Sequence, residues 1–322
     1  NTTGASNVAI GMNALDANTT ASNNVAIGED ALGANTTGAN NVSIGFNALK
    51  DHTTTNDNVA IGYFSMRYNT TGAQNTAVGK GSLQANTTGT CNVAVGYDAG
   101  LTITTNSGCT LIGHGAGRVN TAANNTAIGN GALYANTTGT NNTAVGTGIY
   151  GSTQGALGAN TTGGSNTAIG SRALETNTGA SYSTAIGVNA LLASNADYNT
   201  ALGYNAGTAL TSGDKNTALG AEALDTCTTG AENVAIGQAA LYDNTTASYN
   251  VAVGRFAMRY NTTGTYNVSV GQQALEDNTT ANHNVAIGYF AGASLTTGQQ
   301  NVAVGSVTLA TATTAGYNTA VG

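Results

Sequence analysis

Few side chains in this sequence could carry out acid–base or metal chemistry. Its 322 residues include only three histidines, His52, His114 and His283, and three cysteines. No histidine has further ligands at the spacing of a metal site, so we expect solvated turn residues at all three positions. Adjacent carboxylates, as in Glu29–Asp30 and Glu276–Asp277, point apart in an extended chain and do not converge as an acid and base pair. The sequence therefore predicts no enzyme, no cofactor and no metal site.

Tyrosine is the side chain in this sequence best suited to contact another surface. Fourteen are present, and they gather at two places, directly after a glycine or directly before an asparagine. Their rings could stack on sugar rings or pack on a partner protein. The alternative interpretation is that they cover an apolar edge of the fold. The candidate surface-binding residues are Tyr63, Tyr97, Tyr204, Tyr289 and Tyr150.

A repeat of seventeen residues must position these tyrosines. The unit reads NVAIGQAALYDNTTASY at residues 233–249, and nineteen copies begin between Asn7 and Asn318. A short, fixed period indicates a solenoid or an array. We expect one continuous repeat array over residues 1–322, cut from a longer fibre. Seven extra residues near 149–155 should form a surface loop.

The first four positions of the unit predict a short strand. Position 2 is Val or Thr and position 4 is Ile, Val or Leu, which is typical of a strand with one face in a core. Ile10, Ile27 and Ile44 should therefore line up as one buried column. Position 3 is nearly always Ala, so the other face should also be covered at close range, either by the same chain folding across itself or by a neighbouring subunit. We favour the neighbouring subunit.

The remaining positions predict corners and turns. Position 5 is always Gly, and Gly11, Gly28 and Gly45 indicate a corner with positive φ or no room for a Cβ. Position 9 is usually Leu, a second inward site; four rungs have Gly there, and three of these move an apolar residue to position 12. The Asn-Thr-Thr-Gly segment predicts a turn whose asparagines form hydrogen-bonded ladders. The predicted fold is all-β, a parallel β-solenoid or β-roll of about nineteen rungs.

Charge and hydropathy exclude two classes of partner. The net charge is −7, and the eight Lys and Arg residues are scattered, so no basic stripe is available for nucleic acid. No apolar run approaches the roughly 20 residues of a membrane span, so we expect no membrane insertion. Asn-Thr-Thr also matches the N-glycosylation acceptor pattern, although the repeat alone explains its frequency.

The repeat resembles two groups of surface proteins. Its core, Asn, Val or Thr, Ala, Ile or Val, Gly, two variable residues and Ala or Ser, occurs at residues 58–65, 125–132 and 233–240. It resembles the head repeats of YadA-like trimeric autotransporter adhesins. With Asn-Thr-Thr-Gly included, the unit is even more similar to repeat arrays in tail-fibre proteins of phages and other viruses. This resemblance implies a left-handed β-roll, a side-by-side homotrimer and an extracellular place on a virion or bacterial surface.

We expect a structural and adhesive fibre segment, either a rigid shaft or the receptor-binding region of a viral tail fibre or bacterial surface adhesin. Its partners would be copies of itself and a glycan or protein of the host cell surface. The alternative is an ice-binding β-solenoid whose threonine ladders, with Thr70, Thr87 and Thr262 as candidates, match a lattice. A third hypothesis, a glycan-cleaving β-helix enzyme, needs convergent carboxylates on neighbouring rungs.

Overall fold

The computed structural model describes residues 1–148 and 154–322. They divide into two compact units, residues 1–165 and 166–322. Tyr150 and most of the predicted insertion lie outside the described residues. Within the described residues every regular element is a three-residue strand and none is a helix. The prediction of an all-β parallel solenoid with rungs about 17 residues apart is confirmed.

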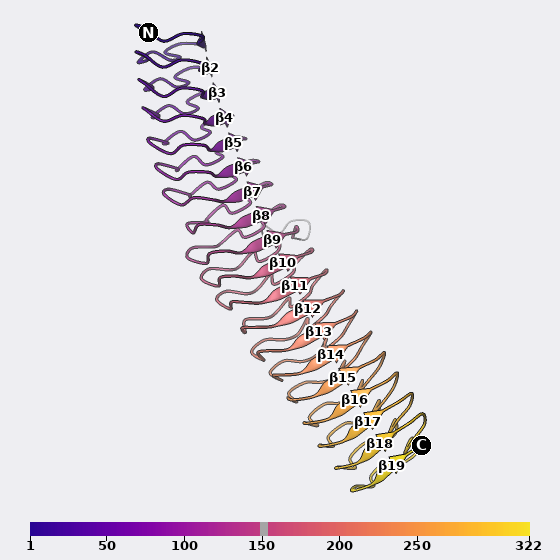
Figure 1. The fold of residues 1–322 in the computed structure, drawn as a ribbon. Coiled ribbons are helices and arrows are strands. Elements are labelled where there is room, and N and C mark those ends of the chain that lie inside the picture. Colours follow the sequence, from indigo (N-terminus) through magenta and orange to yellow (C-terminus); the bar gives the residue numbers. More distant parts are fainter. Residues whose placement is uncertain (149–153) are drawn as a thin grey trace. The chain divides into compact units, whose positions relative to one another are not determined.

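In each unit the strands stack in parallel, and each pairs with the strand of the next rung (Figure 1). The pairing is in register, so that Ile10 lies opposite Ile27, and Ile27 opposite Ile44. The strands of the first unit are β1 (Val8–Ile10), β2 (Val25–Ile27), β3 (Val42–Ile44), β4 (Val59–Ile61), β5 (Thr76–Val78), β6 (Val93–Val95), β7 (Thr110–Ile112), β8 (Thr126–Ile128) and β9 (Thr143–Val145). Those of the second unit are β10 (Thr167–Ile169), β11 (Thr184–Ile186), β12 (Thr200–Leu202), β13 (Thr217–Leu219), β14 (Val234–Ile236), β15 (Val251–Val253), β16 (Val268–Val270), β17 (Val285–Ile287), β18 (Val302–Val304) and β19 (Thr319–Val321).

A glycine corner ends each of these strands, apart from the last, at the point where the chain turns away. Gly11, Gly28 and Gly45 have φ angles of 129°, 129° and 132°. A Cβ on Gly28 would lie 2.6 Å from the carbonyl oxygen of Gly45 on the next rung. Only glycine combines this backbone conformation with so close an approach of the next rung.

The leucine at position 9 adopts a left-handed backbone conformation that the sequence did not lead us to expect. Leu32 has a φ of 50°, yet its side chain is fully buried and its N–H donates to the carbonyl of Ala48 at 3.1 Å. The strained backbone costs about 1–3 kcal/mol, and burying a leucine side chain contributes about 1.5–3 kcal/mol. Gly100 and Gly207 relieve the strain at this position, and the core is filled instead from position 12 of the same rungs, as predicted. The relocated side chains Ile103, Leu210 and Leu295 are all buried.

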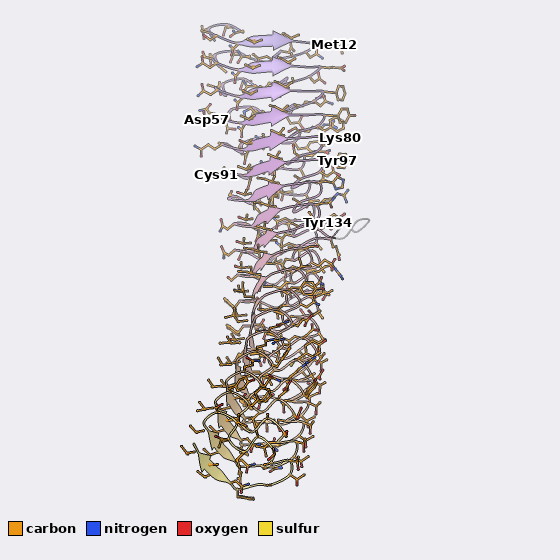
Figure 2. All side chains as sticks on the ribbon, turned by 90° about the vertical axis from the view of Figure 1, so that its right-hand side faces the viewer. Met12, Asp57, Lys80, Cys91, Tyr97 and Tyr134 are labelled. Carbon is orange, nitrogen blue, oxygen red and sulfur yellow. The ribbon has the colours of Figure 1, made fainter. Side chains whose placement is uncertain are left out.

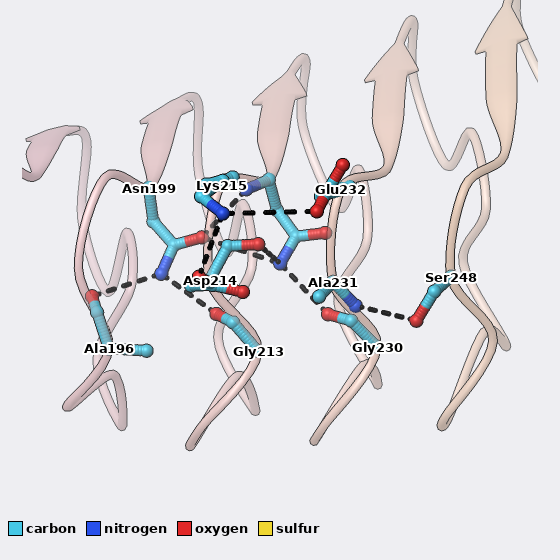
Figure 3. A network of polar contacts seen from close by, with 10 residues as sticks. Ala196, Asn199, Gly213, Asp214, Lys215, Gly230, Ala231, Glu232 and Ser248 are labelled. Atoms are coloured by element: carbon cyan, nitrogen blue, oxygen red, sulfur yellow. Dashed lines mark hydrogen bonds and ion pairs between the residues drawn. The ribbon is translucent and has the colours of Figure 1, made fainter.

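Asparagine side chains hold the turns together inside the coil. The amide of Asn35 closes its own turn, since it donates to the carbonyl of Gly38 and accepts from the Gly38 N–H. The amide of Asn24 also donates to the Gly38 carbonyl, while the Asn24 N–H donates to the side chain of Asn7 on the preceding rung. The same pattern recurs in the second unit, where Asn199 bonds the carbonyls of Ala196 and Gly213 (Figure 3). The predicted asparagine ladders are confirmed, because the turn asparagines also bond from rung to rung, as where the amide of Asn86 donates to the side-chain oxygen of Asn69 at 2.9 Å.

The side chains of the strands face the opposite way to our prediction. Ala26 is fully buried, whereas Val25 and Ile27 beside it are only partly covered. Ile10, Ile27 and Ile44 do align in one column, but that column lies on the surface, and Ile10 is 59% exposed. The interpretation of these isoleucines as core residues is therefore wrong, as is that of the alanine as an outward subunit contact.

The narrow cross-section of the coil explains this inversion. A side-chain period of two separates the two faces of a strand without showing which is inside. The hydroxyl of Ser43, which replaces the strand alanine, donates to the carbonyl of Ala48 across the coil at 2.7 Å, and Ser269 does the same to Ala274. A side chain of two heavy atoms thus already reaches the opposite wall. At this strand position a branched side chain fits inside only where a facing leucine is replaced by glycine, as Leu111 does beside Gly100 and Gly117.

Candidate interaction surfaces

Each unit exposes one uncharged surface along its strands, which we call the sheet face. It consists of the first and third side chains of every strand, all of them Val, Thr, Ile or Leu. Val93, Ile112 and Leu202 are 36%, 38% and 41% exposed. At about 4.8 Å per rung, the nine strands of the first unit give a strip roughly 40 Å long and on the order of 400 Å² in area. Uncharged and largely apolar surfaces of this size are often sites of interaction.

One edge of the sheet face carries the residues that follow the corner glycines, which we call the corner column. Met12, Lys80 and Tyr97 belong to it and project together from that edge of the first unit (Figure 2). Four of the five candidate tyrosines lie in this column, and about half of each side chain is exposed. These are Tyr63, Tyr97, Tyr204 and Tyr289.

Ring stacking within the corner column limits what its tyrosines could bind. Phe46 and Tyr63 stack at 5.3 Å between centroids, and Tyr97 and His114 at 5.2 Å. The ammonium group of Lys80 lies between them, 5.7 Å from the Tyr63 ring and 5.5 Å from the Tyr97 ring. Neighbouring rungs therefore occupy both faces of Tyr63 and Tyr97. Their exposed ring edges and hydroxyl groups, and not their faces, are available to a partner.

The two candidate tyrosines of the second unit have different surroundings. Tyr289 packs edge to face with Phe290 at 4.4 Å. Tyr204 stacks on no aromatic ring of the described residues and is flanked in the corner column by Val188 and Ala221. Of the four, Tyr204 is the one that contacts no aromatic ring and no cation of the described residues.

A second aromatic column runs along the opposite edge of the sheet face. It consists of the residues just before the first Asn of each rung, which we call the lead-in column. Asp57 and Cys91 belong to it and project from the edge opposite to Lys80 (Figure 2). In the second unit this column contains two stacks, Tyr182 on Tyr198, and Tyr249 on Tyr266 on His283, with centroid separations between 4.8 and 5.2 Å.

The three histidines do not share one environment. His114 and His283 are exposed, but His52 is fully buried at the position that Asn occupies in most rungs. Its Nε2–H donates to the carbonyl of Thr55 at 2.8 Å, and its Nδ1 accepts from the amide of Asn69 at 3.2 Å. Burial lowers the pKa of this imidazole. The prediction of a solvated turn residue is wrong for His52.

Some of the other titratable groups form local ion pairs. The carboxylate of Asp30 accepts from Lys50 Nζ at 2.8 Å and from the amide of Asn13 at 3.0 Å, and these bonds lower its pKa. No group of three or more His, Cys, Asp or Glu side chains in the described residues could hold a metal ion. The same residues contain no helix with the length and apolarity of a membrane span.

Apart from the exposed Asn1, the asparagines of the Asn-Thr-Thr-Gly turns are not surface residues. Asn35, Asn69 and Asn86 are fully buried, and their amides are hydrogen-bonded inside the coil. The folded coil has no room for a glycan at these positions.

Comparison of the sequence with protein-family models gives no match, and comparison with curated proteins gives none either. The geometry of the coil itself is therefore what bears on function. That geometry presents one apolar sheet face between two edges lined with aromatic and polar side chains.

Proposed function

We propose that this chain is a segment of a structural, adhesive fibre in which three copies pack side by side through the sheet face. The observation that carries the proposal is the unbroken, uncharged pair of side-chain columns along the strands of each unit. In a chain with a net charge of −7, a strip without a single charge is a surface suited to burial. The host structure would be a viral tail fibre or a bacterial surface adhesin.

A second copy of the chain is the partner that best fits this face. The columns repeat at the rung spacing of roughly 4.8 Å, so two parallel copies can interdigitate their side chains in register along the whole strip. Few other partners would present the same spacing. The side chains also match in shape, because every strand has Val or Thr at its first position and Ile, Val or Leu at its third.

A trimer with threefold symmetry fits a fibre better than a dimer does. Three copies around an axis parallel to the stack can each bury one strip, with all chains running in the same direction. Both aromatic columns then remain at the outer edges, where they could contact a glycan or protein of a host cell. The resemblance of the unit to adhesin head repeats supports the same number of chains.

Light scattering coupled to size-exclusion chromatography tests the assembly. We expect a particle of three times the chain mass of 31.7 kDa. The variant I27D/I61D/V95D, with charges on alternate rungs of the sheet face, should elute as a monomer.

The matched control T37D/T71D/T105D places the same charges on exposed turn threonines of the same unit and should still assemble. A monomeric wild-type chain, or two variants that assemble equally well, would overturn the proposed assembly.

Ice binding is the second candidate function, favoured by a row of exposed threonines. The hydroxyls of Thr70, Thr87 and Thr262 donate to the carbonyl of the next rung, so they are not free to order water. The following threonines, such as Thr71 and Thr88, are exposed and form the row. Thermal hysteresis of the purified protein, lost in T71V/T88V, would support this function; no hysteresis at millimolar concentration would exclude it.

A further inference from the structure

Four of the eight basic residues have no acidic partner in the part of the chain that the structure describes. Lys50, Arg118, Arg172 and Lys215 each lie within 4.0 Å of a carboxylate. In the described residues no carboxylate oxygen comes that close to the other four, which are Lys80 and Arg67 in the first unit and Arg255 and Arg259 in the second. In an acidic chain these unpaired cations require an explanation.

The unpaired cations gather in two similar clusters. The first follows β4 and contains the sequence Phe-Ser-Met-Arg-Tyr at residues 64–68; the second follows β15 and contains Phe-Ala-Met-Arg-Tyr at residues 256–260. In both, the methionine is fully buried in the core and anchors the segment. The arginine and the tyrosine lie on the surface beside it.

Aromatic rings hold the guanidinium group in each cluster. The Cζ atom of Arg67 lies 4.5 Å from the centroid of Phe64 and 5.0 Å from that of Tyr68. In the second unit, Arg259 Cζ lies 4.7 Å from Phe256 and 5.0 Å from Tyr260. The near identity of these distances shows that one arrangement has been built twice.

Burial removes one nitrogen of each guanidinium from solvent. The Nε atoms of Arg67 and Arg259 are buried and have no hydrogen-bond partner in the described residues. The outer nitrogens, Nη1 and Nη2, are therefore the donors that a ligand could reach. A planar fork held in place by two rings loses little conformational entropy when it binds a carboxylate or sulfate in bidentate fashion.

A second cation accompanies each arginine. Lys80 lies over Tyr63, whose ring centroid is 4.0 Å from that of Phe64 in the first cluster. Arg255 lies 4.1 Å from the centroid of Phe256, the same ring that Arg259 contacts. Each cluster thus offers two positive charges around a shared set of rings, next to a partly exposed tyrosine.

We propose that these two cationic–aromatic clusters bind the anionic groups of acidic carbohydrate, that is, the carboxylate of a uronic-type sugar or a sulfate ester. The tyrosine beside each arginine supplies a ring edge and a hydroxyl suited to a sugar ring. Nucleic acid is a poor match, because a polyanion requires a continuous basic stripe and the rest of the chain is acidic. The inference rests on the proposed function in that it names the ligand of the adhesive surface, and each chain would present two such sites.

Calorimetric titration of the assembled protein tests the proposal with three hexasaccharides. The probes are a sulfated heparin fragment, an oligogalacturonate and neutral maltohexaose. We expect binding of at least one acidic probe with two sites per chain, weakening as salt is added, and no binding of the neutral one. The acidic probe that binds identifies the group, sulfate or carboxylate.

Paired variants locate the binding. R67Q/R259Q should weaken binding of the acidic probe by about ten-fold or more, and R67Q alone should leave one site per chain. R67K/R259K keeps the charge but loses the planar fork, so its affinity should lie in between. K80Q/R255Q should also weaken binding. The control R172Q removes an arginine that is already paired with Glu175, at 2.6 Å, and should bind as the wild type does.

Other results would overturn the inference. These are equal affinity for acidic and neutral sugars, no binding of any probe, or unchanged binding by R67Q/R259Q with its melting temperature preserved. Light scattering on the same samples separates the two proposals. A trimer that does not bind acidic sugars would contradict only the proposed sugar binding by the clusters. A monomer that binds them would contradict only the proposed trimer.

Discussion

The imidazole of His52 accepts a hydrogen bond from the amide of Asn69 at its Nδ1 atom, within a column that asparagine fills on most other rungs. Its Nε2–H donates to the carbonyl of Thr55, so the ring is held as one neutral tautomer. A proton on Nδ1 would face the amide hydrogens of Asn69. The ladder of the first unit therefore contains one member whose hydrogen bonding depends on pH.

This arrangement predicts loss of stability in mild acid. Burial lowers the pKa of His52 below the value of about 6.5 expected in the unfolded chain. The unfolded state then binds the proton more readily, so the free energy of unfolding falls as the pH drops below about 6.5 and is constant above it. Thermal melting between pH 5 and pH 8, followed by circular dichroism, should show this decline.

The variant H52N supplies the control, because asparagine completes the ladder without a titrating group. It should melt at the same temperature across the range, apart from effects of the carboxylates at the acidic end. An equal decline in wild type and H52N would show that the buried imidazole is not responsible.

Substitutions at Leu111 and Gly117 should have coupled effects on the stability of the protein. A Cβ on Gly117 would lie 2.7 Å from the Cδ2 atom of Leu111, and one on Gly100 would lie 2.8 Å from its Cδ1 atom. The leucine thus fills the space left by glycine on two rungs. We expect L111A to destabilise the protein by about 2–5 kcal/mol, because a core cavity results.

The double variant L111A/G117L tests this interpretation. It restores the residue types found on most other rungs, Ala at position 3 and Leu at position 9, so part of the lost stability should return. G117L alone should be strongly destabilising, since its side chain collides with Leu111. Urea unfolding gives all four free energies; purely additive effects would contradict the packing described here.

Features that depend on local chemistry could be predicted from the repeat. An invariant glycine indicates a corner in any solenoid, and the glycines at 11, 28 and 45 show the positive φ that such a corner requires. Stacked asparagines predict amide ladders for the same reason, since like residues must meet when rungs align in register. Neither argument requires the interior of the coil to be known.

Features that depend on the width of the coil could not be predicted. Ala26 and Ile27 alternate, and alternation alone does not show which side is inside. The restriction of position 3 to small residues is the available signal, but it fits a subunit contact as well as a narrow interior. The burial of His52 had a signal too, because it aligns with Asn35 and Asn69 in the repeat. The two arginine clusters were visible only as a duplicated sequence.

The corner glycines should tolerate no side chain, whereas Gly115, which also has a positive φ, should tolerate a small one. In G28A the new Cβ would lie 2.6 Å from the Gly45 carbonyl oxygen. The alanine would also have to adopt a φ of 129°, which alanine avoids. We expect a loss of about 3 kcal/mol or more. In G115A the nearest atoms belong to the Tyr134 ring at 3.5 Å, and φ is 62°, so the loss should be about 1–2 kcal/mol. Similar losses in both variants would contradict the close approach of successive corners.

The three cysteines should differ sharply in reactivity. Cys91 lies exposed in the lead-in column, whereas Cys109 and Cys227 are buried inside the coil. Burial raises the pKa of the Cys109 thiol and raises that of Cys227 to about 11. Because the thiolate is the reactive form, we expect a thiol reagent at pH 8 to label one cysteine per native chain and three after unfolding. C91S should leave no native labelling; reaction of two or three thiols in the folded protein would show that the interior is open to solvent.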